Sequence, residues 1–128
     1  MRPEPGSPAD WLEDAESDLA LAESTSERPV RRSHRCFHAQ QAAEKAIKAV
    51  LVSRGADPPK MHNLGALLDL LPPEVALPSA AEEVADLSRY ATVTRYPGSY
   101  EQITEEHFGG ALRLAKSVVE WARDVVRD

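Results

Sequence analysis

The sequence predicts an all-α fold, an up-and-down bundle of four to five helices in a single domain, and three observations support this. Apolar residues recur at three- and four-residue steps in four long segments, a spacing that places them on one face of a helix. Proline and glycine mostly separate these segments. No segment alternates polar and apolar residues as a half-buried strand does.

The first helix is expected to follow a short tail. Residues 1–8 hold three prolines and no apolar run, so we expect a flexible N-terminal tail there and the bundle in residues 9–128. Ser7 is a suitable N-cap, and Pro8 suits the first helical position. The helix should run to about Glu27, and its apolar face should carry Trp11 or Leu12, Ala15, Leu19 and Ala22.

The second helix is predicted from Val30 to Arg54, with Gly55 as its stop. Its expected core face consists of Cys36, Ala39, Ala43, Ala46, Ile47 and Val50. Polar residues also form rows on this helix, Gln40, Glu44 and Lys48 in one, Gln41 and Lys45 in the other. Side chains four residues apart are neighbours on a helix. The rows are therefore interpreted either as a solvated charged face or as one side of a dimer cleft.

Two shorter patterns fill the middle of the chain. Asn63 can cap a short helix that carries Leu64, Leu67, Leu68 and Leu71. A fourth helix is expected from Ser79 to about Thr94, followed by a turn at residues 96–99.

The final helix is the most regular of the set. Thr104 can cap it. Gly109 and Gly110 are expected to weaken its start, by about 1 kcal/mol per glycine relative to alanine. Its apolar face contains Phe108, Ala111, Leu112, Ala115, Val118, Val119, Ala122 and Val125.

Composition narrows the class of protein. The chain of 128 residues has a net charge of -6, which does not favour a protein that coats nucleic acid through bulk charge. A local basic patch remains at Arg28, Arg31, Arg32 and Arg35. The single cysteine, Cys36, excludes an intrachain disulfide and is expected in the core. No apolar run approaches the roughly 18 residues of a membrane span. A cytoplasmic bacterial or archaeal protein without a membrane partner is expected.

Histidine spacing gives little support for a metal site. His34 and His38 are four residues apart, but no glutamate lies between them, and nearby arginines would repel a cation. We therefore predict no metal site and no cofactor.

Two regions are candidates for binding phosphate. His62 and Lys60 lie at the expected start of the short helix, where unsatisfied N–H groups attract anions. The alternative is that His62 caps this helix and packs against the second one. The second set of candidates lies around the later turn and consists of Arg89, Tyr90, Arg95, Tyr96 and Tyr100. Arginine suits bidentate phosphate contact and tyrosine can stack on a base, although both also commonly tie a turn to its neighbours.

Four segments together resemble the HEPN-domain family: residues 11–22, residues 37–51, Lys60-Met61-His62-Asn63-Leu64 and Arg95-Tyr96-Pro97-Gly98. The resemblance extends from about Ala9 to Val126. It implies a bundle of four or five helices, frequently dimeric, that is often encoded beside a minimal nucleotidyltransferase. Some branches of the family are metal-independent ribonuclease toxins with an Arg-x4-6-His motif near the start of a late helix. In such a motif the histidine acts as general base and the arginine holds phosphate.

This sequence departs from that ribonuclease motif. Counting from Arg95, the matching positions hold Tyr100, Glu101 and Gln102, and the next histidine is His107. Tyrosine is a poor base at neutral pH because its pKa is near 10. A surface that binds phosphate survives the loss of the histidine better than catalysis does.

The resemblance therefore favours a non-catalytic module that binds nucleotide or polynucleotide phosphate through Arg95, Tyr96 and Tyr100, with Lys48 and His62 nearby. It would form a homodimer and pair with a minimal nucleotidyltransferase in a system like a toxin–antitoxin pair. The first alternative is a metal-independent ribonuclease toxin that uses Arg95 and His107. The second is a structural dimeric adaptor without a ligand.

Overall fold

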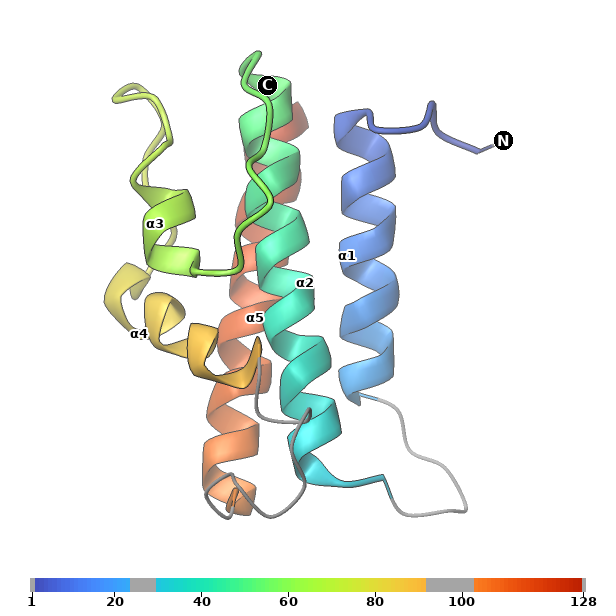
Figure 1. The fold of residues 1–128 in the computed structure, drawn as a ribbon, viewed down its shortest axis with the longest axis vertical. Helices are drawn as coiled ribbons and strands as arrows, with labels where there is room; N and C mark the ends of the chain where they lie inside the picture. Colours follow the sequence, from blue (N-terminus) through green and yellow to red (C-terminus); the bar gives the residue numbers. More distant parts are fainter. Residues whose placement is uncertain (1, 24–29, 92–102, 128) are drawn as a thin grey trace.

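Helices account for all the regular secondary structure in residues 2–23, 30–91 and 103–127, which are the residues that the computed structural model describes. Three of them are long and lie side by side, with the shorter ones packed along one side (Figure 1). The predicted all-α fold is confirmed. The elements are α1 (Pro8–Glu23), α2 (Arg32–Ser53), α3 (Leu64–Leu68), α4 (Ala81–Asp86), the 3-10 helix η1 (Leu87–Ala91) and α5 (Glu105–Arg127).

The ends of the long helices follow the expected local chemistry. The Ser7 hydroxyl accepts a hydrogen bond from the Asp10 N–H at 3.2 Å. At the C-terminal end of α2, Gly55 has a φ of 84° and the Ala56 N–H donates to the Leu51 carbonyl at 3.0 Å. This left-handed glycine satisfies two carbonyls of the last helical turn and reverses the chain.

The centre of the fold is α2, which packs against α1 on one side and α5 on the other. The small side chains along this helix let both neighbours approach closely, and its larger ones, such as Ile47 and Leu51, are fully covered. Every residue of the predicted core face is buried, as are the additional alanines Ala42 and Ala49. On α5, Leu112 and Val125 are only partly buried, while the other six predicted positions are buried.

The predicted fourth helix begins two residues later than expected and does not continue as an α-helix beyond Asp86. α4 starts at Ala81 because Ala80, with a φ of 58°, is in the left-handed region. After Asp86 the chain winds more tightly as η1, which brings Leu87 and Tyr90, three residues apart, onto the same buried side. Residues 92–102, which include the expected end of this helix, lie outside the described residues, as do residues 24–29 at the expected end of the first.

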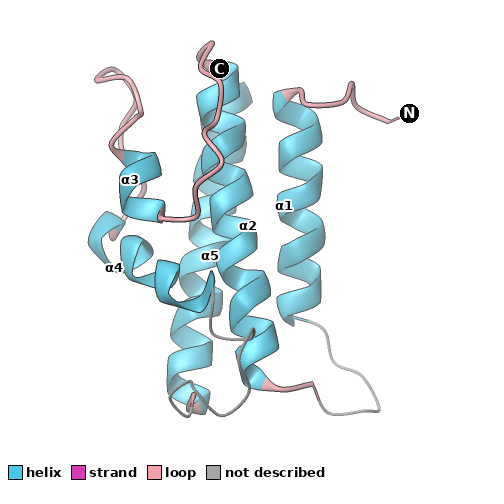
Figure 2. Cartoon of the chain, viewed as in Figure 1, coloured by secondary structure: helices cyan, strands magenta, loops and turns pink. Residues whose placement is uncertain are grey.

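The loop after α2 is the main tertiary feature that the periodicity did not predict. Figure 2 shows it descending along α2 before it enters α3. Met61, near its end, packs against the core, and the polar row of α2 lies beneath it. In the described residues, no helix combines the length and the low polarity needed to cross a membrane.

Candidate functional site

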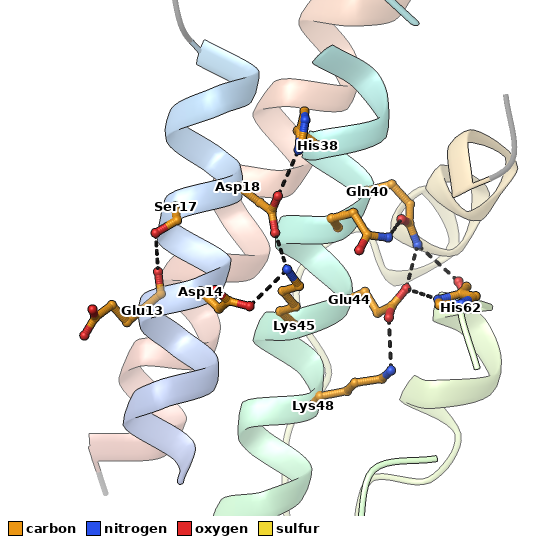
Figure 3. Close-up of polar contacts among 11 residues, drawn as sticks. Glu13, Asp14, Ser17, Asp18, His38, Gln40, Glu44, Lys45, Lys48 and His62 are labelled. Carbon is orange, nitrogen blue, oxygen red and sulfur yellow. Dashed lines mark hydrogen bonds and ion pairs between the residues drawn. The ribbon is translucent and has the colours of Figure 1, made fainter. Parts of the chain in front are cut away.

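A cluster centred on Glu44 replaces the expected solvated face. Glu44 Oε2 accepts from Lys48 Nζ at 3.0 Å, and Oε1 accepts from Gln40 Nε2 at 3.2 Å and lies 2.9 Å from His62 Nδ1 (Figure 3). Gln40 also donates to the His62 carbonyl. Glu44 is only 3% exposed because the loop covers it. The interpretation of this row as a solvated charged face is therefore wrong.

The same cluster contains two of the predicted phosphate ligands, Lys48 and His62. The ammonium group of Lys48 is held by Glu44 and lies 5.8 Å from the centre of the Trp11 ring. His62 remains more than half exposed, with its ring tethered to α2. Their roles as phosphate ligands stay predictions, and each would have to bind phosphate while paired with a carboxylate.

Two of the N–H groups at the start of α3 that could bind a phosphate already donate to side chains of the protein. The Leu64 N–H donates to the Ser88 hydroxyl at 2.7 Å, and the Ala66 N–H donates to Asn63 Oδ1 at 3.0 Å. Asn63 is thus the cap, as predicted, and His62 is not. The second half of the alternative is correct, because the His62 ring contacts α2 through Glu44.

A second cluster, centred on Asp18, joins α1 to the other side of α2. Asp18 Oδ1 lies 2.9 Å from His38 Nδ1, and Oδ2 accepts from Lys45 Nζ at 2.6 Å. Lys45 also pairs with Asp14 at 3.1 Å. Burial lowers the pKa of Lys45, but the hydrogen bonds to the two aspartates outweigh it, so this pKa is raised above 10.5. Sequence reasoning missed Asp18 because it followed only the apolar positions of this helix; the i, i+4 spacing of the two aspartates was the available signal.

Two arginines of the expected basic patch fasten helix ends to each other. Arg32 donates to the Ile103 carbonyl at 3.1 Å and lies 3.4 Å from Glu105. Arg35 donates to the Ala22 carbonyl at 2.9 Å, and its guanidinium lies 4.2 Å from the centre of the Phe108 ring. These contacts hold the start of α2 to the end of α1 and the start of α5.

A pocket of about 350 Å³ opens between α4, η1 and the first turns of α5. Its apolar lining includes Leu87 and Leu114 and the buried residues Tyr90 and Ala111. Titratable side chains from all three elements surround this lining: Glu83 and Asp86 from α4, Arg89 from η1, and Glu106, His107 and Arg113 from α5.

Two of these residues form hydrogen bonds with residues nearby in the chain. Arg89 donates to the Tyr90 hydroxyl at 2.9 Å, and its guanidinium lies 5.0 Å from the centre of the same ring. His107 lies in the first turn of α5, where its backbone N–H donates to the Thr104 hydroxyl at 3.0 Å. The predicted cap of the final helix is therefore confirmed, and it places His107 at the pocket.

The side chain of Arg113 lies beside the glycine pair of the same helix. A β-carbon at Gly109 would stand 3.5 Å from Arg113 Nη1, and one at Gly110 would stand 3.9 Å from Nη2. The guanidinium thus lies back along the helix, within van der Waals contact of a β-carbon at either position. The sequence marked these glycines only as a weakness of the helix and did not single out Arg113. Helix spacing was the missed signal, since residues three and four apart are neighbours.

Three predicted site residues, Arg95, Tyr96 and Tyr100, lie outside the described residues, so their roles stay predictions. Their segment connects η1 to the residues just before α5, and both of these elements contribute to the pocket. His107, proposed to pair with Arg95, shares the pocket with Arg89 and Arg113.

Cys36 is fully buried, as expected for a core cysteine. Burial raises the pKa of its thiol to about 11, against opposing effects from the positive charges of Arg89 and Arg35. A thiol that stays protonated at neutral pH is a poor nucleophile.

Comparisons with known proteins agree with this architecture. Residues 8–125 match the family model of the HEPN domain. Similar solved structures include TT1696 from Thermus thermophilus, with 28% sequence identity and a TM-score of 0.79, covering 94% of this chain and 98% of that one. Another is ST0689, an archaeal HEPN homologue, with 25% identity, a TM-score of 0.71 and the same coverage. Among curated proteins, none matches the sequence significantly.

Proposed function

The chain belongs to the HEPN family, and from this premise we propose that it is a HEPN module that binds nucleotide or polynucleotide phosphate at the pocket between α4, η1 and α5. One observation carries the proposal: Arg89, Arg113 and His107 line a single pocket. The planar donor fork of arginine matches the oxygens of a phosphate, and a histidine N–H adds a further donor.

The remaining lining suits the rest of a nucleotide. Leu87, Tyr90 and Leu114 supply apolar and aromatic surface for a sugar or base. The volume lies at the lower end of the range for small-molecule sites, so the pocket suits one nucleotide or one residue of a polynucleotide. Arg95, Tyr96 and Tyr100 are proposed to extend this site.

Family membership also supports a partner. We propose that the chain forms a homodimer and pairs with a minimal nucleotidyltransferase, as the family resemblance implies, in a system like a toxin–antitoxin pair. The basis is the family alone, so the partner is tested separately from the pocket, by co-purification of the two chains.

The geometry favours metal-independent ribonuclease activity as a second candidate. His107 and two arginines share the pocket, and a histidine beside an arginine is the combination of base and phosphate clamp that such cleavage needs. In this candidate His107 takes the proton from the attacking hydroxyl, and an arginine holds the charge that develops on phosphate.

Fluorescence anisotropy with a labelled short RNA tests the binding. Arg113→Ala should weaken binding about tenfold and reduce the salt dependence by about one ion, because one phosphate contact is lost. Arg127→Ala is the matched control, since Arg127 is exposed at the far end of the same helix and does not line the pocket. Equal affinities for wild type and Arg113→Ala would refute the pocket as the site.

Gel analysis of the same RNA separates the two candidates. Intact RNA after prolonged incubation supports a binding module. Cleavage that His107→Ala abolishes, and that exposed His34→Ala leaves unchanged, would establish the ribonuclease instead.

A further inference from the structure

Two acidic residues line the pocket beside the positively charged residues that are proposed to bind phosphate. Glu83 and Asp86 come from α4, three residues apart and so on one face of the helix. Both are exposed, and α4 contributes no cation to the lining. Neither carboxylate forms an ion pair or a side-chain hydrogen bond with another residue in the described part of the chain.

Arg113, from α5, lines the same pocket as Glu83 and Asp86. Among the described residues it forms no ion pair with them or with any other group. Glu83, Asp86 and Arg113 share one small pocket without pairing with each other, so a ligand can bind to both kinds of charge. Such a ligand must be anionic at one end and must donate hydrogen bonds at the other, because ionised carboxylates only accept them.

We propose that the pocket selects nucleotides whose base carries an exocyclic amino group. The inference rests on the proposed function and adds the direction of binding: phosphate lies toward Arg113 and Arg89, and the amino group donates to Glu83 or Asp86. Adenine and cytosine present such a donor, and carboxylate side chains accept from it, whereas uracil and hypoxanthine present a carbonyl oxygen at the same position. That oxygen would face a carboxylate with no proton between them.

Calorimetric titration of the 128-residue chain in EDTA tests this, with AMP against IMP and CMP against UMP. Each pair differs mainly by an amino group in place of a carbonyl oxygen. We expect AMP and CMP to bind about tenfold more tightly than their partners, the discrimination of one hydrogen bond to a charged group. EDTA removes divalent cations that would otherwise bridge carboxylate and phosphate, so a preference that appears only with added Mg²⁺ would overturn the proposal.

A double variant tests the assigned residues. Glu83→Gln with Asp86→Asn keeps the shape of the wall but removes its negative charge, and it should reduce both preferences to within about twofold. Glu82→Gln is the matched control, because Glu82 is exposed on the same helix and does not line the pocket. A preference that survives in the double variant would overturn the assignment.

The results for the wild type distinguish a failure of this inference from a failure of the proposed function. Equal affinities for AMP and IMP would overturn the amino-group selection and leave phosphate binding standing. The absence of binding by all four nucleotides and by RNA would overturn the proposed function itself.

Discussion

Two clusters on opposite sides of α2 contain the same three kinds of side chain in different settings. Asp18 with His38 and Lys45 joins two long helices, whereas Glu44 with His62 and Lys48 joins a helix to a loop. The side chain of Lys45 is 22% exposed and that of Lys48 only 7%. Among the described residues, Lys45 also pairs with a second carboxylate, on Asp14, whereas Lys48 pairs with one. We therefore expect burial and the number of partners, rather than composition, to decide how much each cluster contributes to stability.

The largest expected effect is at Glu44. Glu44→Gln leaves the ammonium group of Lys48 buried without a carboxylate, and the free energy of unfolding should fall by about 3 kcal/mol. Urea denaturation measures this loss. The exposed pair of Glu23 and Lys116 provides the control, and Glu23→Gln should cost less than about 1 kcal/mol. Equal losses in the two variants would mean that burial under the loop does not govern this cluster.

An intermediate effect on the free energy of unfolding is expected from Cys36, which lies on the apolar side of α2. Because the fold raises the pKa of this thiol from 9.0 to about 11, its stabilising contribution is complete below pH 9 and is lost as the pH rises through 11. Relative to Cys36→Ala, the wild type should lose on the order of 2–3 kcal/mol between pH 9 and pH 12. Denaturation of both proteins across this range measures the difference. Parallel pH profiles would show that the thiol ionises as easily in the fold as outside it.

The smallest expected effect is at Asp18. Asp18→Asn should cost only about 1 kcal/mol, because Asp14 still pairs with Lys45 and the ammonium group remains partly hydrated. The raised pKa of Lys45 adds a signature in pH: its stabilising contribution is present below 10.5 and is lost as the pH rises through the folded value. Asp18→Asn in a Cys36→Ala background should therefore lose less stability at alkaline pH than Cys36→Ala alone. A loss at neutral pH as large as that of Glu44→Gln would break the comparison.

Local patterns predicted much of this fold, since helix type, caps and the core face of α2 depend on spacing within one segment. Ser7, Asn63 and Thr104 all cap as expected. The periodicity could not show that a loop would cover Glu44, because that contact joins residues 18 apart in the chain. The break after Asp86 also has no clear local signal, as Leu87 and Tyr90 fit either kind of helix.

The site was less predictable than the fold. His107, Arg89 and Tyr90 were named from the sequence. Glu83, Asp86 and Arg113 were not, because the pocket arises where α4 and η1 approach α5. Arg113 is eighteen residues beyond Arg95, outside the spacing of the family motif. Its place at the pocket depends on the approach of α4 and η1 to α5, which no spacing within the final helix indicates.

The charge of Arg89 acts in two places, since it lines the pocket and also eases the ionisation of the buried Cys36 thiol. An anion bound beside Arg89 would offset that charge and make the thiolate still harder to form. Binding of an anion in the pocket should therefore slow the alkaline reactivity of the Cys36 thiol, although Cys36 does not line the pocket.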